Sequence, residues 1–131
     1  MMIASTILKE GDRKNMNTAQ FYEQTGSNYP EARSRMVDDK RIFRFVKMFG
    51  NDTAFDRLTA AMDAGDTGEA FRAVHDLKGV SLTLSLTSLA ENASAVTEAL
   101  RAEDMELART LYPSLKECYT RVVSLIGELE A

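Results

Sequence analysis

Cysteine and histidine are almost absent from this 131-residue sequence, which has one of each, Cys118 and His75. A single cysteine cannot form a disulfide within the chain, which is typical of a reducing compartment, so we expect a cytoplasmic location. A structural zinc site needs several cysteine or histidine ligands, so the sequence excludes a Cys/His metal centre. Cys118 falls on an apolar stripe, and we expect it to pack in the core rather than to react.

Long apolar runs and an excess of positive charge are missing as well. No run is long enough to span a bilayer, and the short apolar segment Ile7-Leu8 follows no basic stretch of a signal peptide. The net charge of −4 does not attract the chain as a whole to nucleic acid or to an anionic membrane. We therefore expect neither as a partner. Residues 1–15 are expected to form a flexible tail, and residues 16–131 a single domain.

Alternation of apolar and polar residues, the signal of a half-buried strand, is also lacking, and the chain has only two prolines. Apolar residues instead recur at intervals of three and four, which predicts amphipathic helices. The four main helices run over about 53–64, from Asp66 to about Ser85, from Thr87 to the turn at Glu103-Asp104, and from that turn to Leu129. Short turns make consecutive helices antiparallel neighbours, so the predicted fold is all-α, an antiparallel up-down four-helix bundle. Short helices before residue 50 should pack on one end or side of it.

Three local signals refine this outline. Thr18 is expected to cap a short N-terminal helix. Asp66 and Glu69 have the spacing of a capping box at the start of the second main helix. Pro113 is expected to kink the last helix or to separate its first turn.

The second main helix carries the only histidine, on the side that faces away from the core. At 100° per residue, its apolar arc consists of Ala70, Ala73, Val74, Leu77, Val80, Ser81 and Leu84. His75 lies nearly opposite this arc, so it should face solvent. Lys78 and Gly79 follow at i+3 and i+4 and lie beside it. Phe71 and Leu82 also point outward, where a soluble helix usually carries charge.

These side chains suit a nucleophile that another protein must reach. A neutral imidazole is a competent nucleophile near neutral pH. If His75 accepts a phosphoryl group, the Lys78 ammonium can partly neutralise the new negative charge. Gly79, which costs a helix roughly 1 kcal/mol relative to alanine, leaves room for the partner's backbone.

The run His75-Asp76-Leu77-Lys78-Gly79, read as H-x-L-K-G, resembles the signature of histidine-containing phosphotransfer (HPt) domains, and the resemblance extends from about Phe21 to the C-terminus. It implies a phosphorelay carrier of two-component signal transduction. His75 would be the phosphoacceptor, Lys78 the charge partner and Gly79 the access residue. In the family a Leu-Gly pair often stands about nine residues after the histidine and small residues follow the glycine, whereas here Leu84 precedes Ser85 and Leu82 is bulky.

The resemblance also implies the partners, which are response-regulator receiver domains and a sensor or hybrid histidine kinase. The expected docking residues are Gly68, Phe71, Arg72 and Leu82. Arg72 is either an ordinary solvated residue or a second cation for the phosphoryl group. The receiver would supply the Mg²⁺, so we expect no cofactor in this chain, and we expect a monomer.

Two other classes of function were weighed against this one. A non-catalytic helical adaptor would bind partners through Phe71 and Leu82 without using the chemistry of His75. An autonomous kinase or hydrolase is disfavoured, because the sequence has no glycine-rich phosphate loop and neither a second histidine nor a cysteine nucleophile. The chain is therefore expected to be a phosphotransfer intermediate and not an enzyme.

Overall fold

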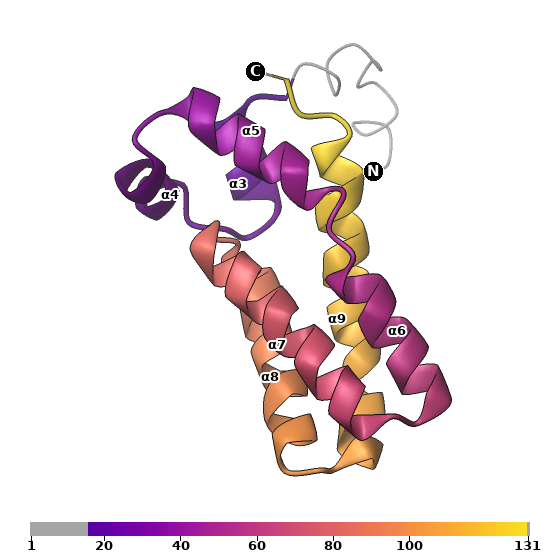
Figure 1. Cartoon of the computed structure of the whole chain (residues 1–131). Helices are drawn as coiled ribbons and strands as arrows, with labels where there is room; N and C mark the ends of the chain where they lie inside the picture. Colours follow the sequence, from indigo (N-terminus) through magenta and orange to yellow (C-terminus); the bar gives the residue numbers. More distant parts are fainter. Residues whose placement is uncertain (1–15, 131) are drawn as a thin grey trace, which may run out of the picture.

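The computed structural model describes residues 16–130, and within this range every regular element is a helix (Figure 1). The helices are α3 (Thr18–Gln24), α4 (Tyr29–Met36), α5 (Asp39–Phe49), α6 (Ala54–Ala64), α7 (Thr67–Thr83), α8 (Thr87–Arg101) and α9 (Met105–Ile126). The all-α prediction is confirmed for this part of the chain. The predicted tail, residues 1–15, lies outside the described residues.

The last four helices lie side by side and alternate in direction (Figure 1). Extensive contacts join α6 to α7, α7 to α8 and α8 to α9. Helices α6 and α9 meet through aromatic side chains: the rings of Phe55 and Tyr119 stack with their centroids 4.2 Å apart. The hydroxyls of Thr59 and Tyr112 are 2.6 Å apart in the same contact. This arrangement is consistent with the expected antiparallel four-helix bundle.

A tight turn fixes the start of α7 against the end of α6. Gly65 closes α6 with a φ of 68°, a conformation that glycine adopts without strain. The Asp66 carboxylate then caps α7 by accepting a hydrogen bond from the backbone N–H of Glu69 (3.1 Å). The Glu69 carboxylate binds Arg57 and Arg72 instead of the backbone of Asp66, so only half of the predicted capping box forms.

The helices α3, α4 and α5 gather at one end of the group formed by α6, α7, α8 and α9 (Figure 1). The buried Tyr22 hydroxyl donates to the carbonyl of Leu84 (2.7 Å), which ties α3 to the C-terminal end of α7. Burial raises the pKa of this phenol, so it stays a neutral donor. Asn17, not Thr18, caps α3: its side chain accepts from the backbone N–H of Gln20 (2.8 Å), and Thr18 is the first helical residue.

The structure refines two expectations about α9. The helix continues through Pro113 from Met105 to Ile126, so of the two expected effects of this proline, separation of a first turn does not occur. Cys118 packs against the core, as expected, but is only half-buried, and this partial desolvation raises the pKa of its thiol.

Ser85, just after α7, stands where the family that the sequence resembles often has a glycine. Ser85 has a φ of 59°, the left-handed region that costs a residue with a Cβ about 1–2 kcal/mol. Its hydroxyl is buried and has no hydrogen-bond partner in the described structure. Ser85 therefore combines backbone strain with an unpaired polar atom.

We predict that Ser85→Gly raises the free energy of unfolding by about 1 kcal/mol. It removes the left-handed strain and the unpaired hydroxyl, and the greater backbone entropy of unfolded glycine offsets about 0.5–1 kcal/mol of this gain. Urea denaturation followed by circular dichroism measures the change. Ser85→Ala is the control, because it removes the hydroxyl and keeps the strain, so it should gain less. A less stable Ser85→Gly protein would contradict this account.

Candidate functional site

His75 lies in the middle of α7 with its side chain exposed, while the opposite side of the helix is buried in the core. Of the seven residues of the predicted apolar arc, six are buried and Val80 is half-buried. Helix α7 packs against both α6 and α8, so its rotation about its own axis is constrained from two sides. The helix therefore presents the imidazole to solvent from a rigid backbone.

Gly79, one turn after His75, leaves open space on the surface. A Cβ built at this position would meet no atom within 4 Å, apart from the backbone of the helix itself. No neighbouring segment of the described chain thus requires a glycine here, although glycine costs a helix interior roughly 1 kcal/mol. Lys78, the residue before it, is half-buried and lies beside His75 at i+3. His75 thus has open space beside it at Gly79 and a positive charge beside it at Lys78.

On the side of His75 toward the N-terminus of α7 lie an aromatic ring and a cation from another helix. The Phe71 ring centroid is 5.7 Å from that of His75. The Arg101 guanidinium, at the end of α8, lies 5.2 Å from the centroid of the same Phe71 ring. Phe71 is consequently half-buried rather than fully outward. Cation–π attraction favours this position of the ring, which lies beside the imidazole.

A charge network ties this part of α7 to α6. Arg57 of α6 donates to Glu69 (3.1 Å) and to Asp76 (2.9 Å), and Arg72 also donates to Glu69 (3.2 Å). Hydrogen bonds to Asp76 and then to Glu69 raise the pKa of the Arg57 guanidinium. The bonds from Arg57 and then Arg72 lower the pKa of the Glu69 carboxyl. Arg72 thus already has an anionic partner, which favours the simpler of its two interpretations.

The other expected docking residues lie on either side of His75. Gly68 is exposed and borders, with Phe71 and Arg101, a depression of ≈ 280 Å³. Leu82 has 50% of its surface exposed. Phe71 and Leu82 are eleven residues apart, about 16 Å along the helix, so they flank the histidine and do not touch each other. Arg35 of α4 donates to the carbonyl of Leu82, a contact that the sequence did not indicate.

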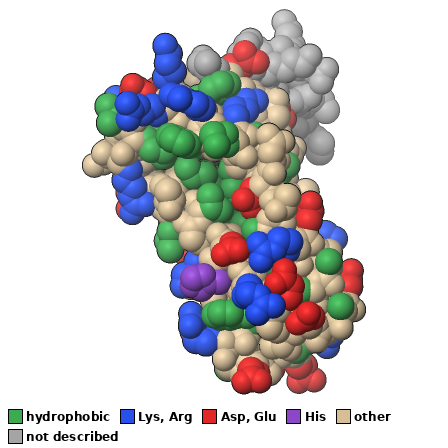
Figure 2. Space-filling model, viewed as in Figure 1, with side chains coloured by type: hydrophobic (Ala, Val, Ile, Leu, Met, Phe, Trp, Pro, Cys, Tyr) green, Lys and Arg blue, Asp and Glu red, His purple; other side chains and the backbone are tan. Residues whose placement is uncertain are grey.

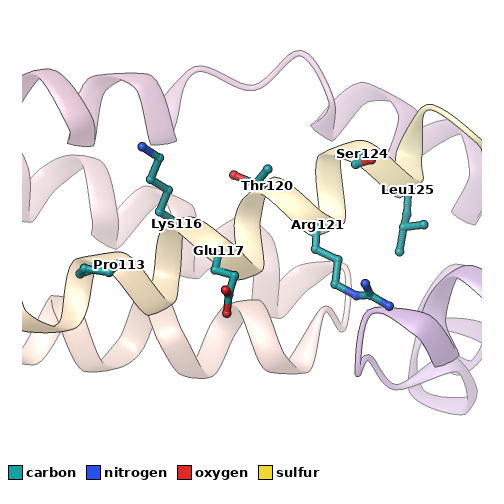
Figure 3. A pocket seen from close by; sticks show the side chains of 7 residues that line it. All are labelled: Pro113, Lys116, Glu117, Thr120, Arg121, Ser124 and Leu125. Carbon is teal, nitrogen blue, oxygen red and sulfur yellow. The ribbon is translucent and has the colours of Figure 1, made fainter. Parts of the chain in front are cut away.

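A hollow of ≈ 540 Å³ lies along α9 (Figure 3). Its labelled side chains spread in different directions from one helix and do not converge on a point. Arg121, one of them, donates to the carbonyl of Gln24 (3.1 Å) and so ties α9 to α3. This hollow therefore lacks the converging polar groups expected of a binding site.

Within residues 16–130, no three histidine, cysteine or acidic side chains group closely enough to hold a metal ion. Among the helices of the same range, none combines the length and the apolar character needed to cross a membrane.

We predict that Arg101 controls the environment of His75 through Phe71. Because the chain has one histidine, its imidazole protons give one set of NMR signals. Arg101→Ala should shift these signals, since Phe71 is released and its ring current moves. Phe71→Leu should shift them more, and Arg101→Lys, which keeps a cation, should shift them less. Arg109→Ala, an exposed arginine of α9, is the matched control. Unchanged signals in Arg101→Ala would show that the stack does not position the imidazole.

The family model of the Hpt domain matches residues 50–125, more than half of the chain. Comparisons with curated proteins and with solved structures gave no match. The matched segment runs from the turn before α6 almost to the end of α9 and includes His75, Lys78 and Gly79. Hpt domains act as phosphocarriers in two-component phosphorelays, where they interact with receiver domains and histidine kinases, and they are phosphotransfer intermediates rather than enzymes in their own right. The match establishes that this chain belongs to the Hpt domain family.

Proposed function

We propose that His75 accepts a phosphoryl group from a receiver-domain aspartate and passes it to an aspartate of another receiver. The observation that carries this proposal is an exposed imidazole beside the unobstructed backbone of Gly79, within the segment that matches the Hpt domain. The incoming group is bulky and arrives on another protein, so the acceptor must stand clear of its own fold. The helices α6–α9 would form the up-down four-helix bundle that carries it.

The transfer needs only positioning and charge neutralisation from this chain. A ring nitrogen of His75 attacks the phosphorus of the aspartyl phosphate, the N–P bond forms, and the P–O bond to the aspartate breaks to release its carboxylate. The Lys78 ammonium lies on the same side of α7 and stabilises the negative charge of the transferred group. The acid pocket and Mg²⁺ belong to the receiver, so this domain needs no cofactor of its own. Transfer to the next receiver reverses these steps.

The partners that follow are receiver domains of response regulators and a sensor or hybrid histidine kinase. The protein acts as a monomer in this proposal, since each receiver must reach the same exposed face. Gly68, Phe71 and Leu82 line the approach on both sides of His75, and Arg72, paired with Glu69, lies at its edge.

The decisive experiment incubates the full chain with phosphorylated receiver domains and tests the chemistry of the transferred label. We expect label that is acid-labile and alkali-stable, as a phosphohistidine N–P bond requires, and none on His75→Gln. A pure adaptor would bind the receivers, take up no label and ignore the substitution. ATP turnover by the isolated protein should be absent, and its presence would instead favour an autonomous kinase or hydrolase.

Substitutions at Lys78 and Gly79 should distinguish the phosphoryl-transfer step from the access of the receiver to His75. Lys78→Ala removes the neutralising charge, so it should slow phosphorylation of His75 about tenfold or more, both by a receiver and by phosphoramidate, a small phosphodonor. Gly79→Gln adds a side chain to open space, so it should block the receiver and leave phosphoramidate labelling intact. Both proteins should remain folded by circular dichroism, and Gly79→Gln should be about as stable as the parent or more so. Normal transfer from a receiver to Gly79→Gln would refute the access role.

A further inference from the structure

An apolar groove lies between α5 and the C-terminal half of α7, on the same face of the molecule as His75. Its volume is ≈ 310 Å³, and its walls include Phe45 and Met48 of α5 and Val80 and Thr83 of α7. The Phe45 and Met48 side chains keep 42% and 60% of their surface exposed. Figure 2 shows hydrophobic side chains gathered over α5, with the purple histidine lower on the same face. This is a concave apolar surface that the described chain leaves uncovered.

The outer edge of the groove is cationic. Helix α5 carries four basic residues and one acidic residue, in a chain whose net charge is −4. Arg41 and Arg44 precede Phe45 and Met48 by one turn, so each lies next to one of these apolar side chains. Both arginines are exposed, and neither has an ion-pair partner among residues 16–130. Asp52 is the one acidic residue in the groove lining. The rim therefore favours an acidic partner surface.

The groove is close enough to His75 to be covered by the same partner. Thr83, the exposed groove residue of α7, follows His75 by eight residues, about 12 Å along the helix axis and about 80° around it. A specific protein interface buries roughly 800 Å² on each partner, which corresponds to a circle of about 16 Å radius. A receiver centred on His75 consequently reaches the groove and must either fill it or leave apolar surface exposed inside the interface.

The two walls of the groove differ in their relation to the family. The α7 wall belongs to the segment that matches the Hpt domain, residues 50–125, whereas α5 ends before that segment begins. One wall is therefore shared with the family, and the other is contributed by a part of the chain that the family model does not cover. A partner that fills this groove therefore contacts residues both inside and outside the segment that matches the family model.

We propose that the groove between α5 and α7 is a docking site for the receiver that exchanges phosphoryl groups with His75. The receiver inserts an apolar side chain between Met48 and Val80 and sets acidic groups against Arg41 and Arg44. Helix α5 thereby selects among receivers that would all meet the same His75 surface. This inference rests on the proposed function and adds a partner-selecting surface to it.

The test uses the full chain and two substitutions at exposed positions, Met48→Glu and Arg44→Glu. Met48→Glu places a negative charge in the groove. In single-turnover transfer from a phosphorylated receiver, it should raise the apparent KM, the receiver concentration that gives half the maximal rate, at least tenfold, while the maximal rate changes less than twofold. Arg44→Glu should give a similar loss that shrinks as salt is added, because screening weakens the charge contact. Two receivers of different sequence should be affected to different extents. Leu107→Glu is the matched control, since Leu107 is 44% exposed on α9, and it should transfer normally.

Phosphoramidate labelling separates this inference from the proposed function. Equal labelling of Met48→Glu and the parent protein shows that His75 and the fold are intact, so a raised KM for the receiver then reports docking. An unchanged KM in Met48→Glu would overturn the docking site while the proposed function stands. A parent protein that sediments as a dimer, with a monomeric Met48→Glu, would assign the groove to a second copy and also overturn it. If neither donor labels the parent at His75, both proposals fail.

Discussion

The burial of one face of α7 is the constraint on which the rest of the molecule depends. Ala70 and Ala73 are small enough for α6 and α8 to approach closely, and Val74 and Leu77 fill the space between the helices. If α7 were turned so that His75 faced inward, the side chains of Val74 and Leu77 would be exposed, and burial of such a side chain contributes about 1.5–3 kcal/mol. The imidazole would also be buried without a hydrogen-bond partner, which costs further free energy. The exposure of His75 is thus a consequence of core packing and does not depend on contacts of the histidine itself.

Contacts at the edges of the buried face of α7 then hold the side chains around His75 in position. Arg57 holds α7 to α6 through Glu69 and Asp76, and Arg101 reaches Phe71 from α8. Each contact joins α7 to a different neighbour, so together they resist rotation in both directions. Such exposed pairs contribute little to stability individually, and their importance lies in holding the geometry around the imidazole.

The sequence predicts those features that depend on local periodicity and local turn chemistry. The helix boundaries around Gly65 and Asp66, the outward position of His75 and the all-α class all follow from spacings of a few residues. Pro113 and Glu69 show where local rules fail. Helix α9 accommodates a proline because packing along its length outweighs the loss of one hydrogen bond, and Glu69 prefers the guanidinium of a neighbouring helix to a capping hydrogen bond.

The contacts that the sequence could not predict are those between distant segments. Arg101 is twenty-six residues after His75 and Arg57 is eighteen before it, and nothing in their own neighbourhoods indicates that they meet α7. The groove is a similar case. The periodicity of α5 correctly indicates that one side of it packs in a core, and Ile42 and Val46 are indeed buried. It does not reveal that Phe45 and Met48 of the same helix come to lie beside α7, which only the tertiary structure brings about.

The net negative charge of the chain hides an uneven distribution, because basic side chains lie close to the face that carries His75. An acidic chain repels an acidic partner at long range, but this repulsion is screened beyond about 8 Å at physiological salt. At shorter range the cations of Arg41 and Arg44 lie beside the groove and that of Lys78 lies beside His75, so an acidic partner is favoured on this side of the molecule over the rest of the surface. Electrostatic complementarity of this kind affects orientation and association rate more than final affinity. That suits a member of the Hpt domain family, because a phosphocarrier must release each receiver after transfer, and tight binding would slow the relay.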